Sequence, residues 1–201
     1  MKQEPIIRVE NLNIGYEDKV IMRDLTFNIA KGDIFIIMGG SGCGKSTLLR
    51  TLTGLIPPQG GQIFIQDIEM NTATADEKLE IMKHTGILYQ SGALFSSMTL
   101  GENVALPLQQ YTTYSQNKIE QIVAFKLALV GLSGYEDYYP SEISGGMCKR
   151  AGLARALALD PEIVYFDEPS AGLDPISSKN LDDLILEINK TLGTTIIVVT
   201  H

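Results

Sequence analysis

The sequence predicts an α/β protein with a mainly parallel sheet, and three observations indicate this fold class. Short apolar runs typical of buried strands alternate with segments of helical periodicity in the second half of the 201 residues. A glycine-rich turn, GGSGCGKST at 39–47, joins one such strand to a helix. Hydrophobic residues make up 44% of the chain, which is enough for a substantial core between sheet and helices.

Strands dominate the first ninety residues. Apolar and β-branched residues favour strands at 6–16 and 20–30, which the polar break EDK separates. After the glycine-rich turn, helical periodicity favours a helix at 44–55, which IPPQGG ends. The further elements expected here are a strand at 33–39, a strand at 62–67, a helix at 75–84 and a strand at 85–90.

A helical insertion is expected in the middle of the chain. The run 116–132 is strongly helical and ends at Gly131, and a polar, tyrosine-rich connector follows it. Beyond the connector, the pattern returns to helices that alternate with buried strands. The elements expected there are a helix at 146–158, a strand at 163–168, a helix at 177–192 and a strand at 194–200.

These elements predict a single domain over 1–201 with two subdomains. Residues 1–90 and 160–201 are expected to form the core together with a β subdomain, and roughly 91–159 a helical subdomain. The chain stops at His201, directly after a strand that no helix follows. We therefore expect the C-terminal part of such a domain to continue beyond this residue.

Composition excludes several classes of function. The net charge of −8 and a pI of about 4.8 argue against a nucleic-acid-binding protein, which normally needs a basic face. Two cysteines, Cys43 and Cys148, are too few for a disulfide framework and fit a reducing compartment. No signal-type segment and no apolar run of about 20 residues is present. We expect a cytoplasmic protein that reaches a membrane only through a partner.

The glycine-rich turn predicts a phosphate-binding loop, because it matches G-x-x-x-x-G-K-[ST] between a strand and a helix. Glycines let backbone N–H groups turn toward phosphate oxygens, and the helix start favours an anion. Lys45 would reach the β- and γ-phosphates, and Ser46 would bind Mg²⁺. The alternative is a simple strand-to-helix turn. The predicted ATP-binding residues here are Gly39, Gly40, Ser41, Gly42, Cys43, Gly44, Lys45, Ser46 and Thr47.

Two further motifs carry chemistry. IVYFDEP, 163–169, places Asp167 and Glu168 at the end of an apolar strand, where charges are costly unless a cation or a reaction uses them. Asp167 suits Mg²⁺, and Glu168 suits the water that attacks the γ-phosphate. SGGM, 144–147, opens a helix like a second phosphate site, or serves only as a helix cap. The chain thus has two phosphate-binding helix starts but only one lysine loop. Either both helix starts face one site within a chain, or each completes a site on another copy.

The order of these motifs is similar to that of the ATP-binding-cassette (ABC) ATPases, over essentially the whole chain. That order is the phosphate loop, a Gln after a strand, ISGGM, IVYFDEP, SAGLD and a strand that ends in His. The resemblance implies the ABC ATPase form of the P-loop NTPase fold. In that fold an N-terminal antiparallel β subdomain and an α-helical subdomain flank a mainly parallel core. It also implies a head-to-tail homodimer in which two ATP molecules lie between phosphate loop and signature residues. The signature residues are Ser144, Gly145 and Gly146.

The resemblance assigns roles to four more residues. Tyr16 matches the aromatic residue that stacks on adenine, and Gln90 the residue that joins Mg²⁺ and water to the transport partner. Asp174 resembles the loop that crosses the dimer, and His201 the catalytic histidine that contacts the γ-phosphate alongside Glu168. The cofactors implied are ATP and Mg²⁺. The expected Mg²⁺ ligands are Ser46, Gln90 and Asp167.

Within this family, the stretch after Gln90 and the Met147 of ISGGM resemble the ATPase subunits of Mla/Mce-type phospholipid transporters. That resemblance implies phospholipid movement between inner and outer membranes, with the ATPase on the cytoplasmic face of the inner membrane. Its implied partners are a permease, a Mce-type lipid-binding protein and a small cytoplasmic accessory protein. An ATPase of an amino-acid or metal importer is the first alternative. A non-transport cassette protein is the second.

The uncharged stretch YQSGALFSSMTL, 89–100, is too apolar for an ordinary exposed loop. One interpretation is a docking surface for a permease helix, formed by Leu94, Phe95 and Met98. The other is a loop buried within the domain. In the first case, this stretch would link the nucleotide site at Gln90 to the membrane partner.

Overall fold

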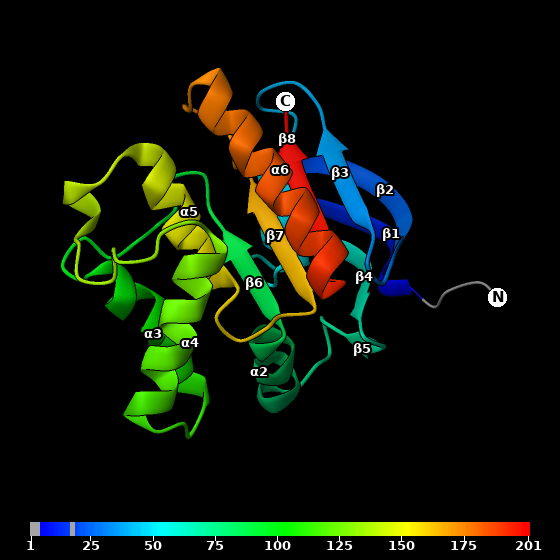
Figure 1. Ribbon diagram of the computed structural model, residues 1–201. Coiled ribbons are helices and arrows are strands. Elements are labelled where there is room, and N and C mark those ends of the chain that lie inside the picture. Colours follow the sequence, from blue (N-terminus) through cyan, green and yellow to red (C-terminus); the bar gives the residue numbers. More distant parts are fainter. Residues whose placement is uncertain (1–4, 17–18) are drawn as a thin grey trace.

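The computed structural model describes residues 5–16 and 19–201, and Figure 1 shows the arrangement of its elements. The strands of the described part are β1 Pro5–Tyr16, β2 Lys19–Ala30, β3 Ile34–Met38, β4 Gly60–Ile65, β5 Ile68–Glu69, β6 Thr85–Leu88, β7 Ile163–Asp167 and β8 Thr195–Thr200. The helices are α1 Lys45–Leu52, α2 Ala75–Lys83, α3 Leu100–Tyr111, α4 Gln116–Leu129, α5 Gly145–Ala156 and α6 Pro175–Leu192, with a 3₁₀ turn at Pro140–Glu142.

A four-stranded parallel sheet with the order β3-β8-β7-β6 forms the centre of the molecule (Figure 1). All three of its strand pairs are parallel. The carboxyl ends of its strands therefore meet at one edge. The last strand, β8, lies inside this sheet, and its Ile196 and Ile197 are fully buried on opposite faces. Within the described part, the final strand is thus covered, although no helix follows it in sequence.

The N-terminal part forms a separate antiparallel sheet with the order β2-β1-β4-β5. Helix α1 contacts β1 on one side and β7 and β8 on the other, so it fills the space between the two sheets. One apolar core joins these layers, and Leu12, Leu52 and Tyr165 are among its fully buried members. The antiparallel β subdomain expected from the sequence is confirmed.

The opposite face of the parallel sheet packs on α5 and α6, and α3 and α4 pack beside α5 (Figure 1). This second core contains Leu100, Leu127, Leu153 and Phe166, all almost completely buried. The helical subdomain is therefore attached to the parallel sheet through α5. Among the described residues, no helix is both long enough and apolar enough to cross a membrane.

Helix α3 was expected only as part of a general helical insertion, and it contains Pro107. Its start is nevertheless encoded locally. The Thr99 side chain accepts a hydrogen bond from the Glu102 N–H, and the Glu102 carboxylate accepts one from the Thr99 N–H. Pro107 removes one backbone donor, yet the helix continues to Tyr111 because tertiary packing buries its apolar face.

Several predicted boundaries were wrong by a few residues. The strand expected at 62–67 is β4, which ends at Ile65 because Gln66 and Asp67 have positive φ angles of 49° and 65° and turn the chain. The helix expected at 44–55 ends at Leu52. The helix expected at 177–192 starts two residues earlier at Pro175, a residue type that suits the first turn.

Candidate functional site

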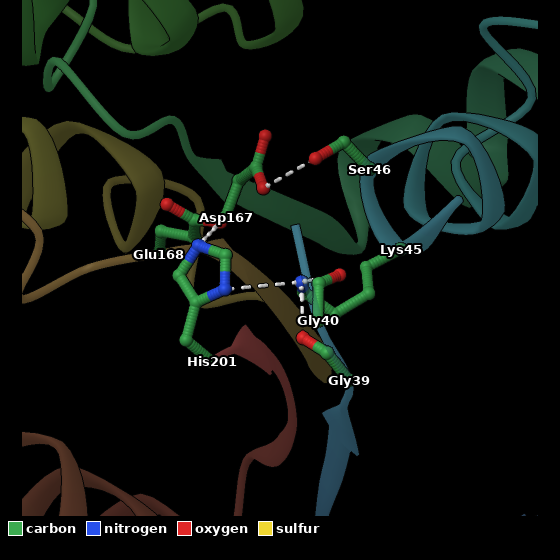
Figure 2. A network of polar contacts seen from close by, with 7 residues as sticks. All are labelled: Gly39, Gly40, Lys45, Ser46, Asp167, Glu168 and His201. Carbon is green, nitrogen blue, oxygen red and sulfur yellow. Dashed lines mark hydrogen bonds and ion pairs between the residues drawn. The ribbon is translucent and has the colours of Figure 1, made fainter. Parts of the chain in front are cut away.

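The candidate site lies where the parallel strands end. The glycine-rich loop follows β3, Asp167 and Glu168 follow from β7, His201 follows β8, and Gln90 comes two residues after β6. Since these strands are neighbours with their carboxyl ends at one edge, residues far apart in sequence come together (Figure 2).

The glycine-rich loop has the backbone that its sequence predicted. Gly42 and Gly44 have φ angles of 78° and 105°, which disfavour any residue with a Cβ atom. A Cβ atom on Gly44 would also lie only 2.5 Å from the Ile21 side chain. Ser41 and Cys43 are exposed at the tip of the turn, and the Cys43 N–H donates to the Gly40 carbonyl. The tip of the loop is therefore open to solvent.

Lys45 begins α1 and is only 5% exposed. Its ammonium group donates hydrogen bonds to the carbonyl oxygens of Gly39 at 2.6 Å and Gly40 at 3.1 Å. Its Nζ also lies 3.3 Å from Nδ1 of His201. Figure 2 shows the side chain folded back into the loop, where it places a positive charge among backbone groups. A buried cation held by neutral carbonyls is well suited to an anionic ligand.

The residue after this lysine, Ser46, lies close to the Asp167 carboxylate. The Ser46 hydroxyl is 3.3 Å from Oδ1 of Asp167 (Figure 2). Both side chains are partly buried. A hydroxyl and a single carboxylate are hard oxygen donors of the kind that bind Mg²⁺ together with phosphate oxygens and water. The donor set therefore fits the magnesium ion that the sequence predicted, but the exposed Gln90 lies one strand away, at the end of β6.

Glu168 and His201 form a close pair. Nε2 of His201 lies 2.7 Å from Oε1 of Glu168. The glutamate side chain is 16% exposed, whereas the histidine is 54% exposed. Glu168 has a φ angle of 49°, a left-handed conformation that costs a non-glycine residue on the order of 1–3 kcal/mol. Such strain is common where a side chain must point into a site, and Figure 2 shows Glu168 facing the histidine.

Tyr16 lies at the end of β1, and 44% of its surface is exposed. Its hydroxyl oxygen accepts hydrogen bonds from Thr47 at 3.5 Å and from Arg50 at 3.3 Å, both on α1. These contacts, the Thr47 hydrogen bond first, lower the pKa of Tyr16. The ring is thus held beside the glycine-rich loop with part of its surface free for stacking.

The loop after Gln90 is tied down by two residues that sequence reasoning missed. Asn103 is fully buried, and its side chain accepts from the Phe95 N–H and lies within hydrogen-bond distance of three loop carbonyls. Arg155 of α5 donates to the carbonyls of Gly92 and Ala93 at 3.1 and 2.8 Å. An Asn inside an apolar helix pattern was the signal that could have identified the first of them.

The apolar residues of this loop differ in their exposure. Leu94 packs against the core of the helical subdomain, so it is only partly accessible. Phe95 is 51% exposed, and Met98 is partly exposed. Phe95 is therefore the large apolar side chain that the loop presents to solvent.

The described part of the fold also contains a cavity of about 500 Å³. It is lined by residues from the end of α1, the turn after it, α2 and the strands β4 and β6, and Leu55, Ile56 and Met82 are among its apolar members. Tyr89, the residue before Gln90, also lines it. Tyr165 reaches the same cavity from β7. Burial raises the pKa of Tyr165, whose hydroxyl has no hydrogen-bond partner within the described residues.

The second helix start lies elsewhere in the fold. Ser144 caps α5 by accepting a hydrogen bond from the Met147 N–H at 3.2 Å, and Gly145 has open space where a Cβ would stand. Helix α5 packs on β6, whereas the glycine-rich loop follows β3 at the other edge of the sheet. With strands about 4.8 Å apart, the supporting strands are separated by about 14 Å. One chain therefore does not bring the two helix starts into one site.

Asp174 has a local role in this chain. Its carboxylate accepts hydrogen bonds from the N–H groups of Ile176 and Ser177, so it caps α6. Hydrogen bonds from Ser177, the largest cause, lower the pKa of Asp174. The side chain is exposed, so the cap leaves it accessible to a partner.

Comparison with known sequences identifies relatives over nearly the whole chain. Residues 22–171 match the sequence profile of the family described as ABC transporter. The chain is 46% identical to the probable ribonucleotide transport ATP-binding protein mkl of Mycobacterium tuberculosis, over 97% of this chain and 54% of that protein. It is 44% identical to the intermembrane phospholipid transport system ATP-binding protein MlaF of Haemophilus influenzae, over 98% and 74%. The chain thus spans about half the length of its mkl relatives.

Solved structures share the fold. MJ0796, a dimeric ATP-binding cassette in a post-hydrolysis state bound to ADP and Pi, matches with a TM-score of 0.87 and 30% identity. That match covers 97% of this chain and 88% of the other. CbiO1 of Clostridium perfringens, part of the transporter complex cbiONQ, matches with a TM-score of 0.89 and 30% identity, over 99% and 79%.

Proposed function

Because this chain belongs to the ABC transporter family and has the fold of its ATP-binding cassettes, we propose that it is the ATP-hydrolysing subunit of a membrane transporter. The observation that carries the proposal is the polar network of Figure 2. There a buried lysine, an oxygen pair and a Glu–His pair from three strands meet at one edge of the sheet. Each is a group that phosphoryl transfer to water requires.

The residues divide the work of hydrolysis. The loop amides and Lys45 bind and orient the phosphates, and Tyr16 supports the base of the nucleotide. Ser46 and Asp167 would hold Mg²⁺, with Gln90 as a further ligand from β6; the ion neutralises charge on the phosphate oxygens when bound. Glu168 accepts the proton of the attacking water, and His201 orients that carboxylate through its 2.7 Å contact.

The active form that we propose is a head-to-tail homodimer. The glycine-rich loop and the Ser144 helix start belong to opposite edges of one sheet. A second copy, turned around, would bring its Ser144, Gly145 and Gly146 to the first copy's loop. Asp174, exposed at the start of α6, would lie in the segment that crosses between the copies.

ATP turnover by designed variants tests this proposal. Glu168→Gln removes the proton acceptor and keeps the shape of the side chain, so it should bind ATP and dimerise while hydrolysis falls on the order of 100-fold or more. Ser144→Arg should retain ATP binding to the monomer and lose turnover, whereas Ser141→Arg, at another exposed serine, should retain both. Normal turnover in Ser144→Arg would refute the shared site.

Phospholipid is the cargo that we propose, moved between the inner and outer membranes from the cytoplasmic face of the inner membrane. Similarity to MlaF proteins, whose names state intermembrane phospholipid transport, supports it. The name of the mkl relatives favours ribonucleotides as a second candidate. Reconstituted transporter should move fluorescent phospholipid between vesicle populations in an ATP-dependent manner. Movement of labelled ribonucleotide alone would overturn the lipid assignment.

The partners that we propose are a permease, a Mce-type lipid-binding protein and a small accessory protein. Phe95 supports the first of these, because it offers an exposed aromatic anchor on the loop after Gln90. Phe95→Asp should prevent co-purification with the permease and leave ATP affinity unchanged, and Leu79→Asp on α2 provides a control at another exposed apolar residue. A stable Phe95→Asp complex would contradict this docking surface.

A further inference from the structure

Lys149 is a buried cation that the proposed chemistry does not use. It lies in the second turn of α5, five residues after Ser144, and is only 6% exposed. Its ammonium group donates hydrogen bonds to the carbonyl oxygens of Pro169 at 2.7 Å and Ala171 at 2.5 Å. Both acceptors belong to the loop that follows Glu168. One side chain thus ties α5 to the segment directly after the candidate proton acceptor.

Burying this charge is unfavourable, so its position needs a physical reason. Desolvation lowers the pKa of Lys149, and the negative charge of Glu168 acts in the opposite direction. A Met side chain of similar length would fill the space without that cost. What the ammonium group supplies, and Met lacks, is a pair of donors for two backbone carbonyls together with a positive charge near Glu168.

The start of the loop that Lys149 contacts is anchored at Glu168, whose N–H donates to the Val199 carbonyl of β8 at 2.9 Å and whose carboxylate contacts His201. Glu168 is held in the left-handed region with φ at 49°. Inside the loop, the Ala171 N–H donates to the Glu168 carbonyl at 3.1 Å and the Leu173 N–H to the Ser170 carbonyl at 3.2 Å. Such short-range turns do not fix the direction of a strained residue by themselves, since they move with it. Beyond the β8 and His201 contacts of Glu168 itself, Lys149 holds the next part of the loop from outside, through the Pro169 and Ala171 carbonyls.

We propose that Lys149 is a positioning residue that fixes the loop 168–173, and through it the direction of the Glu168 carboxylate. This inference rests on the proposed ATPase function. We call the contact of Lys149 with this loop the Lys149 clamp. Because Ser144 caps the helix that carries Lys149, the clamp links two places in one chain: the start of α5, which we propose faces the second copy, and the proton acceptor Glu168. Engagement of one site would then be felt directly at the other.

The test compares three variants of the complete protein. Lys149→Met removes both donors and the charge, and Lys149→Gln keeps donors without the charge. Arg150→Met is the matched control, because this neighbouring cation on α5 donates to the Val130 carbonyl at 3.2 Å, away from the catalytic loop. Steady-state ATPase kinetics and hydrogen exchange of the Ala171 and Leu173 amides are measured for each.

We expect Lys149→Met to lower kcat about tenfold or more, with the KM for ATP changed no more than roughly twofold. Exchange of the two loop amides should rise about tenfold, and Lys149→Gln should recover a large part of both losses. A role in folding alone would lower thermal stability and leave kcat and loop exchange unchanged, which would overturn the proposal. Equal effects in Arg150→Met would also overturn it.

The two proposals fail in different ways. If the wild-type protein does not hydrolyse ATP, the proposed function fails, whatever the variants do. Loop exchange needs no turnover, so faster exchange in Lys149→Met with slow exchange in Arg150→Met still tests the clamp. Unchanged exchange and unchanged kcat in Lys149→Met would refute the clamp while the ATPase assignment stands.

Discussion

Asn103 provides a sharp test of how the loop after Gln90 is held. Replacing it by Ala removes a fully buried side chain whose Oδ1 accepts from the Phe95 N–H at 2.8 Å. Its Nδ2 lies 3.1, 3.2 and 2.9 Å from the carbonyls of Phe95, Met98 and Thr99. The amide nitrogen has two hydrogens, so it satisfies two of these three acceptors at a time.

The size of the effect follows from this count. Three hydrogen bonds at about 1 kcal/mol each would be lost, and part of that is recovered because water reaches the partly exposed loop. We expect the free energy of unfolding to fall by about 2–3 kcal/mol. For a domain of this length, that corresponds to a fall in Tm of about 4–12 °C.

Thermal and urea unfolding measure this change, with Gln110→Ala as a control at an exposed position of the same helix. Because the loop carries Phe95, the Asn103→Ala variant should also bind the permease less tightly while its affinity for ATP is retained. If Asn103→Ala lost less than about 0.5 kcal/mol, or no more than Gln110→Ala, the loop would not depend on this amide.

Two further predictions concern α1 and α6. Lys45→Ala should lose tight ATP binding, measured by calorimetry, because the loop then has no buried cation facing the phosphates. Asp174→Ala should lower Tm at pH 7 by removing the helix cap, whereas Asp174→Asn should retain it. Because the folded-state pKa of Asp174 is lowered, its stabilisation is present above the unfolded value of about 3.9 and is lost as pH falls through the folded value. The Tm difference between wild type and Asp174→Ala should therefore shrink below about pH 4, and a constant difference would refute this origin.

Much of the fold could be predicted because its signals are local. The strand–loop–helix pattern around Lys45 requires glycines at Gly42 and Gly44, and the structure has positive φ at both. Alternation of buried strands with helices predicts a parallel sheet, and a parallel sheet brings the ends of its strands to one edge. The meeting of Asp167, Glu168 and Lys45 was expected from their motifs and from the family resemblance, and the parallel sheet gives the physical reason for it.

What the sequence could not predict depends on contacts between distant segments. The position of Asn103 in an apolar helix pattern signals a buried polar group, but the sequence does not say that its partners are the backbone groups of 95–99, because that contact arises only when α3 packs under the loop. The same is true of Arg155, which reaches the Gly92 carbonyl across 63 positions of sequence. Propensity and periodicity describe faces of elements, and they contain no information on which backbone group a long polar side chain will find.

Three cationic side chains of α5 connect this helix to other segments of the chain. Lys149 reaches the loop after Glu168, Arg150 reaches the end of α4, and Arg155 reaches the loop after Gln90. All three cations donate to backbone carbonyls, so they constrain the chain and not merely a side chain. The helix that starts at Ser144 is thereby fastened to both loops that flank the candidate nucleotide site. A shift of its start would be transmitted to Glu168 and to the Phe95 loop together, because a rigid helix cannot move one end alone.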